Sequence, residues 1–199
     1  FGYDARRRLR YRARALEDHI FEFGYEYDAL DRQVKTVFPD GQSLERSYDG
    51  ANRLTGIKDV LSRVEYDARG LLSARVYDNG VKASYDYDVR QRLSKLALRD
   101  TQDKAIFDLT LTRDRVGHLQ KVEARERDSR RGLKAEYDPW YRVTSATLAA
   151  GGSVPETLGF AYDANDNILS RTSDAKQSPG QVGEYSYDSA HPNAVERLA

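Results

Sequence analysis

The pattern that most nearly resembles a metal site lies near the C-terminal end of the chain. Asp163, Asn165 and Asn167 place side-chain oxygen atoms at alternate positions, and Asp174 is the twelfth residue of the same frame. This spacing suits calcium, but the sixth position holds Ile168, where a calcium-binding EF-hand loop requires glycine for its sharp turn. We therefore interpret the segment as a structural turn and predict no metal site.

Other reactive side chains do not cluster in the sequence. There is no cysteine, which excludes disulfides, thiolate catalysis and cysteine-ligated zinc. His19, His118 and His191 are scattered, so we predict turn or surface positions for them. The serines lack a nucleophile-elbow context, and no aspartate is distinguished as a general acid. We predict no catalytic residue, no cofactor and no enzymatic activity.

The aromatic pair Trp140-Tyr141 follows Pro139 and leaves two interpretations open. The favoured one is packing of both rings at a turn, because large aromatic side chains are mostly buried. The alternative is an exposed aromatic site that binds a ligand.

Tyr-Asp dipeptides divide the chain into repeats, and they define the residues to which we assign a structural role. These are Tyr3 and Asp4, Tyr27 and Asp28, Tyr48 and Asp49, Tyr66 and Asp67, Tyr87 and Asp88, Tyr137 and Asp138, Tyr162 and Asp163, and Tyr187 and Asp188. Arg113-Asp114 fits the one wide gap as a degenerate copy. The intervals are then roughly 18 to 26 residues, as in repeat architectures.

The residues after each Tyr-Asp predict a β-hairpin. Three positions after the aspartate stands a residue such as Gly70 or Gly117, which tolerates a positive φ angle. A basic residue and then Leu, Val or Ile usually follow. We expect the tyrosine to end a strand, the aspartate to form an Asx-turn and the aliphatic residue to begin the return strand. Arg7, Gln91 and Tyr141 replace the expected residue, so those turns are expected to differ in type.

Further turns are predicted at residues 39–41 and 78–80, which read Pro-Asp-Gly and Asp-Asn-Gly. Residues 121–131 have helical propensity, but we predict an extended hairpin there to match the remainder of the chain. The sequence thus predicts an all-β fold of tandem antiparallel β-hairpins, with about sixteen to eighteen strands that form a curved sheet strip.

An arginine-rich segment, ARRRLRYRARAL, precedes the aromatic segment FEFGYEYD. Alternation along a strand places Arg8, Arg10, Arg12 and Arg14 on one face. If the two segments form a hairpin through residues 15–20, arginine would face carboxylate and apolar residues would face aromatic ones. We therefore predict an ion-pair ladder here, and not a nucleic-acid interface.

The composition agrees with this interpretation. Lys+Arg and Asp+Glu both number 32 among 199 residues, so the chain has no net charge to attract nucleic acid or an anionic membrane. No apolar segment is long enough to cross a membrane, so no membrane insertion is predicted. The sequence contains no methionine and begins inside the repeat pattern, so we expect residues 1–199 to be one continuous repeat segment of a larger protein, without a separate second domain.

The repeats resemble the YD repeats of the rearrangement-hotspot (Rhs) family over nearly the whole chain. The segments that carry the resemblance are YEYDALDR, YDGANRLTGI, YDARGLLSARVYDNG, YDYDVRQRLSKL and FAYDANDNILSR, and SYDSAHPNAV is similar to a His-Pro variant of late repeats. In bacterial Rhs proteins, insecticidal toxin complexes and teneurins, such repeats form a β-sheet strip that spirals into a hollow shell. The self-cleavage signature of the family, Asp-Pro-x-Gly-Leu, is not found here, since Asp138-Pro139 is followed by Trp140-Tyr141.

The resemblance implies a structural segment of a shell that encloses and protects a toxin or effector domain of a secreted or cell-surface bacterial protein. Its partners would be the remaining repeats of that shell and the enclosed toxin domain, and not nucleic acid. The alternative is a surface interaction module whose tyrosine-rich sheet binds carbohydrate or a partner cell surface.

Overall fold

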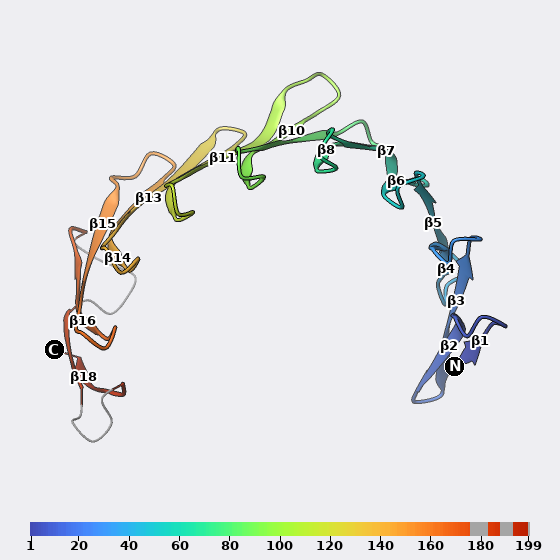
Figure 1. The fold of residues 1–199 in the computed structure, drawn as a ribbon, viewed down its shortest axis with the longest axis horizontal. Coiled ribbons are helices and arrows are strands. Elements are labelled where there is room, and N and C mark those ends of the chain that lie inside the picture. The colour runs from blue at the N-terminus through green and yellow to red at the C-terminus, as the bar shows by residue number, and fades with distance from the viewer. Residues whose placement is uncertain (176–182, 188–192, 199) are drawn as a thin grey trace. The chain divides into compact units, whose positions relative to one another are not determined.

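The chain is all-β, as the repeats predict. The structure is a computed structural model that describes residues 1–175, 183–187 and 193–198, and these residues form eighteen strands (Figure 1). The chain divides into two compact units. Unit 1 comprises Phe1–Ser84 with Asp100–Gln102, and unit 2 comprises Tyr85–Arg99 with Asp103–Ala199. Within the described ranges, no helix has the length and apolar character needed to cross a membrane.

Unit 1 is a series of short antiparallel strands. They are β1 (Gly2–Tyr3), β2 (Leu9–Leu16), β3 (His19–Tyr27), β4 (Gln33–Val37), β5 (Ser43–Tyr48), β6 (Leu54–Ile57), β7 (Leu61–Tyr66) and β8 (Leu72–Tyr77), followed by β9 (Lys82–Tyr87), whose first residues pair with β8. Each strand from β1 to β8 pairs with the next one in the sequence.

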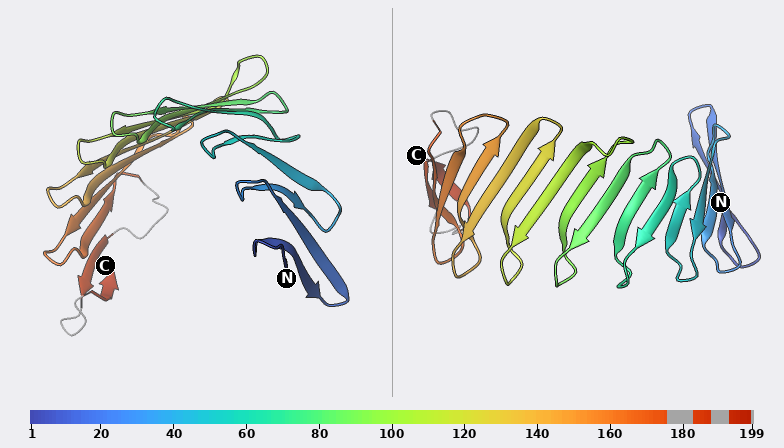
Figure 2. Two further views of the ribbon diagram at one scale, coloured as in Figure 1. Left: turned by 45° about the vertical axis from the view of Figure 1, so that its right-hand side comes forward. Right: turned by 90° about the horizontal axis from the view of Figure 1, so that it is seen from above.

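Unit 2 continues the pattern with longer strands. They are β10 (Leu93–Arg99), β11 (Ala105–Arg113), β12 (Leu119–Glu126), β13 (Ser129–Tyr137), β14 (Val143–Ala150), β15 (Glu156–Tyr162), β16 (Ile168–Ser173), β17 (Gly183–Tyr187) and β18 (Val195–Leu198). Within this unit the strands lie side by side, and successive turns alternate between the two edges (Figure 2).

The repeat boundaries coincide with strand ends. Tyr27 is the last residue of β3, and Gln33, which replaces the usual aliphatic residue, is the first of β4. The register shifts by one residue just before Tyr27, so each such turn ends in a β-bulge, and the same shift recurs before Tyr48, Tyr66 and Tyr137. The turns at residues 39–41 and 78–80 lie between β4 and β5 and between β8 and β9, and residues 121–131 form the β12–β13 hairpin, as predicted.

The predicted ion-pair ladder between β2 and β3 is wrong. A two-residue turn at Glu17-Asp18 pairs Leu16 with His19, so Arg12 lies opposite Phe23. The Arg12 guanidinium carbon lies 5.0 Å from the centre of the Phe23 ring. A loop at residues 15–20 would keep the same register, with Arg14 opposite Phe21, so the prediction placed arginine and carboxylate on one face wrongly. Arg12 therefore stacks on an aromatic ring, and Arg14 also lies opposite an aromatic residue, Phe21, and not opposite a carboxylate.

In unit 2, the sheet has one mainly apolar face and one polar face. Cross-strand neighbours on the apolar face include Leu96 and Leu109, Leu111 and Val122, and Leu133 and Leu148. The polar face carries charged and small residues at the alternate positions. Among the described residues of both units, few hydrophobic side chains are buried, and these are Leu61, Val64, Ala83, Ala97, Ala135 and Leu158. Repetition of hydrogen-bonded contacts between neighbouring strands therefore takes the place of a central core.

Candidate functional site

Each Tyr-Asp turn is organised by the carboxylate of its aspartate. In the β3–β4 turn, Oδ1 of Asp28 accepts hydrogen bonds from the amides of Leu30 at 2.9 Å and Arg32 at 3.0 Å. The amide of Asp31 donates to the carbonyl of Asp28 at 3.2 Å, and Asp31 has a φ angle of 63°. This is the predicted Asx-turn, closed by a residue in the left-handed conformation.

The same turn recurs along the chain. Its Oδ1 contacts are repeated at Asp4, Asp49, Asp67, Asp88, Asp138 and Asp163. The expectation that Arg7, Gln91 and Tyr141 give different turns is wrong, because their φ angles are 62°, 63° and 71° and their amides donate to the same carbonyl. The aspartate contacts hold these residues in the left-handed region despite a cost of roughly 1–2 kcal/mol per residue.

A basic side chain completes the turn. The Arg32 Nε donates to Oδ2 of Asp28 at 2.6 Å, and both side chains are about one-fifth exposed, at 21% and 23%. Arg8, Arg53, Arg92 and Arg142 repeat this contact with Asp4, Asp49, Asp88 and Asp138. In the 67–71 turn the fifth residue is Leu71, and Arg69 binds Oδ2 of Asp67 instead, at 2.7 Å. Asn167 replaces the arginine in the turn of Asp163.

The tyrosine hydroxyl joins one repeat to the preceding one. The Tyr27 hydroxyl donates a hydrogen bond of 2.9 Å to the carbonyl of Leu9, the first residue of β2. The same contact runs from Tyr48 to Gln33, from Tyr66 to Leu54, from Tyr137 to Leu119, from Tyr162 to Val143 and from Tyr187 to Ile168. In an antiparallel hairpin, the start of the first strand lies beside the end of the second strand. The hydroxyl–carbonyl hydrogen bond can therefore form in hairpins of different lengths.

The arginine of one turn also contacts the next turn. The Arg8 guanidinium carbon lies 4.7 Å from the centre of the Tyr27 ring, and Arg8 Nη1 donates to the carbonyl of Asp28 and to Oδ1 of Asp31. Arg32 lies over Tyr48 at 5.0 Å, Arg53 over Tyr66 at 4.6 Å, and Arg142 over Tyr162 at 4.7 Å. We call this linked set of Tyr-Asp turns and their basic residues the turn ladder. Within each unit it runs along one edge of the sheet.

The degenerate repeat keeps the link with a different side chain. Arg113 stands in the place of the tyrosine, and its Nη1 donates to the carbonyl of Leu93 at 2.5 Å. A Cβ atom added at Gly117 would lie 2.7 Å from Nη1 of Arg92, so the arginine of the preceding turn extends over this glycine. The sequence showed that Asp114 keeps its place, but it did not show that Arg113 takes over the hydrogen bond.

His118 takes the place of the arginine in the same repeat. Its ring contacts Oδ2 of Asp114 at 2.9 Å and lies 4.8 Å from the ring centres of both Tyr137 and Tyr141. Partial desolvation raises the pKa of Asp114, but hydrogen bonds from the amides of Gly117 and His118 and from the His118 ring outweigh it and lower the pKa to about 2. His118 is thus a turn residue, as predicted.

The other turn aspartates share this electrostatic character. The amide hydrogen bond from Arg8 lowers the pKa of Asp4, and the corresponding amides of Arg53 and Arg92 lower the pKa of Asp49 and Asp88. Desolvation opposes this effect in each case. All three carboxylates are therefore ionised hydrogen-bond acceptors, and none of the three is an acid that would release a proton near neutral pH.

The packing expected for Trp140 is not observed, since its side chain is 72% exposed. Its ring contacts the guanidinium carbon of Arg142 at 5.4 Å. Tyr141 is 59% exposed but stacks on His118, so only this ring of the pair takes part in the turn ladder.

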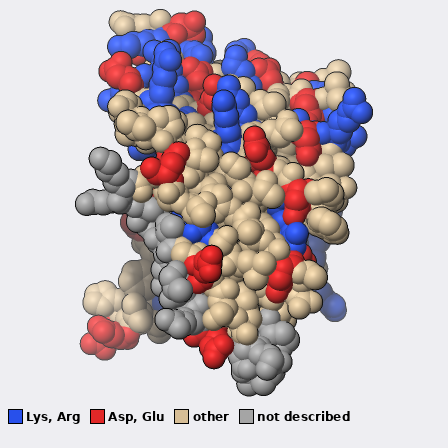
Figure 3. All heavy atoms as spheres, turned by 90° about the vertical axis from the view of Figure 1, so that its left-hand side faces the viewer, with Lys and Arg blue, Asp and Glu red and all other residues tan. Residues whose placement is uncertain are grey.

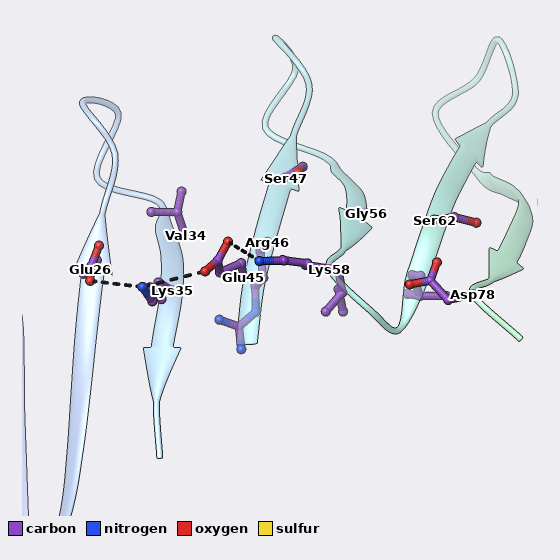
Figure 4. A pocket seen from close by; sticks show the side chains of 12 residues that line it. Glu26, Val34, Lys35, Glu45, Arg46, Ser47, Gly56, Lys58, Ser62 and Asp78 are labelled. Carbon is purple, nitrogen blue, oxygen red and sulfur yellow. Dashed lines mark ion pairs between the residues drawn. The ribbon is translucent and has the colours of Figure 1, made fainter. Parts of the chain in front are cut away.

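A separate hollow of about 590 Å³ lies on the polar face of unit 1, over β3 to β7 (Figure 4). Lys35 lies between Glu26 and Glu45, at 3.8 Å and 3.7 Å, and Lys58 lies 3.9 Å from the second oxygen of Glu45. Figure 4 shows these four side chains in a row across neighbouring strands. Their charges alternate, so this hollow is electrostatically compensated.

The remaining sequence candidates include residues inside and outside the described ranges. Tyr3 ends β1 and is 62% exposed, and Asp188 and His191 lie outside the described residues. Asp163 caps its turn, whereas Oδ1 of Asp174 accepts a hydrogen bond from the amide of Thr157. In the described ranges, no group of three or more His, Cys, Asp or Glu side chains is arranged to hold a metal ion.

Comparison with known proteins finds a family model that matches part of the chain. The family model described as RHS Repeat matches residues 27–64, which contain the Tyr27 and Tyr48 turns and end before Tyr66. This segment is therefore similar to an RHS repeat. No curated protein gives a significant match to the sequence.

Solved structures of Tc toxin proteins share the fold. The crystal structure of TcdB2-TccC3 without its hypervariable C-terminal region matches with a TM-score of 0.70 and 19% identity over 89% of this chain and 10% of that chain. The TcdB2-TccC3-Cdc42 crystal structure matches with a TM-score of 0.67 and 20% identity over 81% of this chain and 10% of that chain.

The Photorhabdus luminescens Tc holotoxin pore matches with a TM-score of 0.66 and 20% identity over 80% of this chain and 9% of that chain. The chain therefore spans about a tenth of the length of the solved chains that it matches. At this level of identity the comparison shows a shared fold: the RHS-type sheet of antiparallel hairpins.

Proposed function

We propose that this chain is a wall segment of an RHS-repeat shell, which encloses and protects a toxin or effector domain of a secreted bacterial protein. The observation that carries the proposal is the turn ladder, in which each repeat holds the next through a tyrosine hydroxyl and a basic side chain. A wall needs such a joint at every repeat, because a sheet without a central core is held together by its neighbour contacts. The similarity to Tc toxin structures supports the same role.

The proposed role of the segment is structural and not catalytic. The turn aspartates are held as ionised caps by amide and guanidinium donors, so they are acceptors committed to the backbone. The shell would keep the enclosed domain away from proteases and from the producing cell, and the partners of this segment would be the neighbouring repeats and that domain.

The test is protection of the enclosed domain in the full-length parent protein. Limited proteolysis should leave a large resistant particle that contains these residues and the enclosed domain. Replacement of both Tyr137 and Tyr162 by alanine removes two successive joints, and we expect the enclosed domain to become cleavable. Replacement of both Leu30 and Val89 by alanine is the matched control, because these turn side chains are 62% and 98% exposed and protection should be kept. Equal protection in all three proteins would contradict the proposal.

The exposure of Trp140 favours a second candidate, a surface module that binds carbohydrate. An indole ring that is 72% exposed and stabilised by a neighbouring guanidinium offers a flat apolar face for a sugar ring. A glycan array probed with the chain and with Trp140→Ala separates the candidates. Binding that is lost in the variant would favour the surface module, and no binding by either protein would remove it.

A further inference from the structure

A second hollow, of about 400 Å³, lies on the polar face of unit 2 and is lined by residues of β11 to β14. Asp108, Arg125 and Arg130 face one another across three strands, because Asp108 is paired with Arg125 and Arg125 with Arg130. Glu123 and Gly132 form the next cross-strand pair on the same face. The hollow therefore has charged walls and a floor of small residues.

Two arginines stand directly opposite each other in this hollow. Like charges at directly opposed positions destabilise a sheet. In the described part of the chain no ion pair is found for Arg125 or Arg130, and the Arg125 Nε donates to the carbonyl of Arg127 at 3.2 Å. The hollow of unit 1 differs, since there Lys35 stands between Glu26 and Glu45.

The acids that line the hollow are already engaged. Arg99 Nη2 lies 2.7 Å from Oδ1 of Asp108, although this ion pair is not aligned as a hydrogen bond. Lys121 Nζ lies 2.8 Å from Oε1 of Glu123. Each acid thus has a basic partner other than Arg125 and Arg130, and neither acid forms an ion pair with these two arginines.

Glycine at position 132 leaves the floor of the hollow open. A Cβ atom added at Gly132 would lie 3.7 Å from the carbonyl of Val122 and 3.8 Å from Cβ of Ala149, which are ordinary contacts. Packing therefore does not require glycine at this position. The absence of a side chain at Gly132 leaves space in the hollow that Arg125 and Arg130 also line.

We propose that this hollow binds a tetrahedral oxyanion, a phosphate or sulfate group, between Arg125 and Arg130. Arginine presents a planar set of N–H donors that matches the oxygen atoms of such groups. A bound dianion would remove the repulsion between the two arginines. Figure 3 shows charged side chains of both signs close together on one side of the molecule, and the chain has no net charge. Selective binding of an anion would therefore depend on how Arg125 and Arg130 are placed in the hollow, and not on the net charge of the chain.

The test is calorimetric titration of the full chain with inorganic phosphate at constant ionic strength. We expect saturable binding that Arg125→Gln and Arg130→Gln each weaken about tenfold, because both remove charge-assisted hydrogen bonds. Gly132→Ala should weaken binding while keeping both charges. Arg127→Gln is the matched control, since it removes the same charge from the same hairpin but does not line the hollow, and it should change the affinity less than about twofold.

Parallel titrations with a sulfated disaccharide and with phosphatidylglycerol vesicles identify the source of the anion. Tighter binding of one of them, lost in Arg125→Gln and Arg130→Gln, assigns the site to a sulfated glycan or to a lipid headgroup. Binding of inorganic phosphate alone assigns it to the free ion. Absence of saturable binding to all three probes, or equal weakening by Arg127→Gln, would overturn the proposal. Circular dichroism of each variant shows that the sheet is intact.

Discussion

Replacement of Arg113 by tyrosine tests whether the turn ladder stabilises the chain. In wild type, Arg113 donates to the carbonyl of Leu93, but it offers no ring to the arginine of the preceding turn. In Arg113→Tyr the hydroxyl would donate to the same carbonyl, as Tyr137 does to Leu119 at 2.9 Å. The ring would in addition lie beneath Arg92.

The expected gain comes from the new cation–π contact. Corresponding contacts in the other repeats have guanidinium carbons 4.6–5.0 Å from the ring centres. Such contacts contribute about 0.5–1 kcal/mol at exposed sites. For a chain of this length, that gain raises the melting temperature by about 1–4 °C.

Urea and thermal unfolding, followed by far-ultraviolet circular dichroism, would measure the effect. A change in the urea midpoint at constant slope reports a change in stability, which matters here because repeat proteins can lose two-state behaviour. Arg113→Leu is the control. It removes the donor to Leu93 and should lower the free energy of unfolding by about 0.5–1.5 kcal/mol. If Arg113→Tyr were no more stable than Arg113→Leu, the assigned role of the turn ladder would be refuted.

Three further predictions concern single turns. Tyr137→Phe removes the hydroxyl that contacts Leu119 and should lower the free energy of unfolding by about 1 kcal/mol. Tyr141→Phe should leave the free energy of unfolding unchanged in the same urea titration. Equal effects of the two variants would contradict the role assigned to the Tyr137 hydroxyl. The pKa of Asp114 is lowered from 3.8 to about 2, so its stabilising contribution is complete above pH 3.8 and is lost as the pH falls toward 2. The melting temperatures of wild type and Asp114→Asn should therefore converge over that interval, and a constant difference would argue against the cap. Gln91→Gly removes the conformational cost of a left-handed backbone at this position and should raise the free energy of unfolding by about 1 kcal/mol. Gly70→Ala should lower the free energy of unfolding by a similar amount, because Gly70 has a positive φ angle. A loss of stability in Gln91→Gly would show that the φ angle of 63° at Gln91 is not strained.

Much of the fold could be predicted from the sequence because the turns are local. The aspartate accepts hydrogen bonds from residues two and four positions on, so Tyr-Asp and the next few residues are enough to locate a turn. Alternation of side chains then defines the strands between turns. The same local contacts explain why Arg7, Gln91 and Tyr141 do not alter the turn, a result that residue preferences alone predicted wrongly.

The contacts between repeats could not be predicted in the same way. The distance in sequence from Leu9 to Tyr27 differs from that between Leu54 and Tyr66, so no fixed spacing marks the hydroxyl–carbonyl link. The exposure of Trp140 also depends on what surrounds its turn in space.

The sequence by itself determined where the chain turns, which segments form strands and that these hairpins resemble RHS repeats. Tertiary structure decided which side chains face one another, as the β2–β3 hairpin shows. A two-residue turn at Glu17-Asp18 places Arg12 opposite Phe23, and a turn longer by one residue would place it opposite a carboxylate. The physical reason is that side chains alternate between faces with a period of two, so cross-strand pairing depends on turn length, which only the closed hairpin reveals.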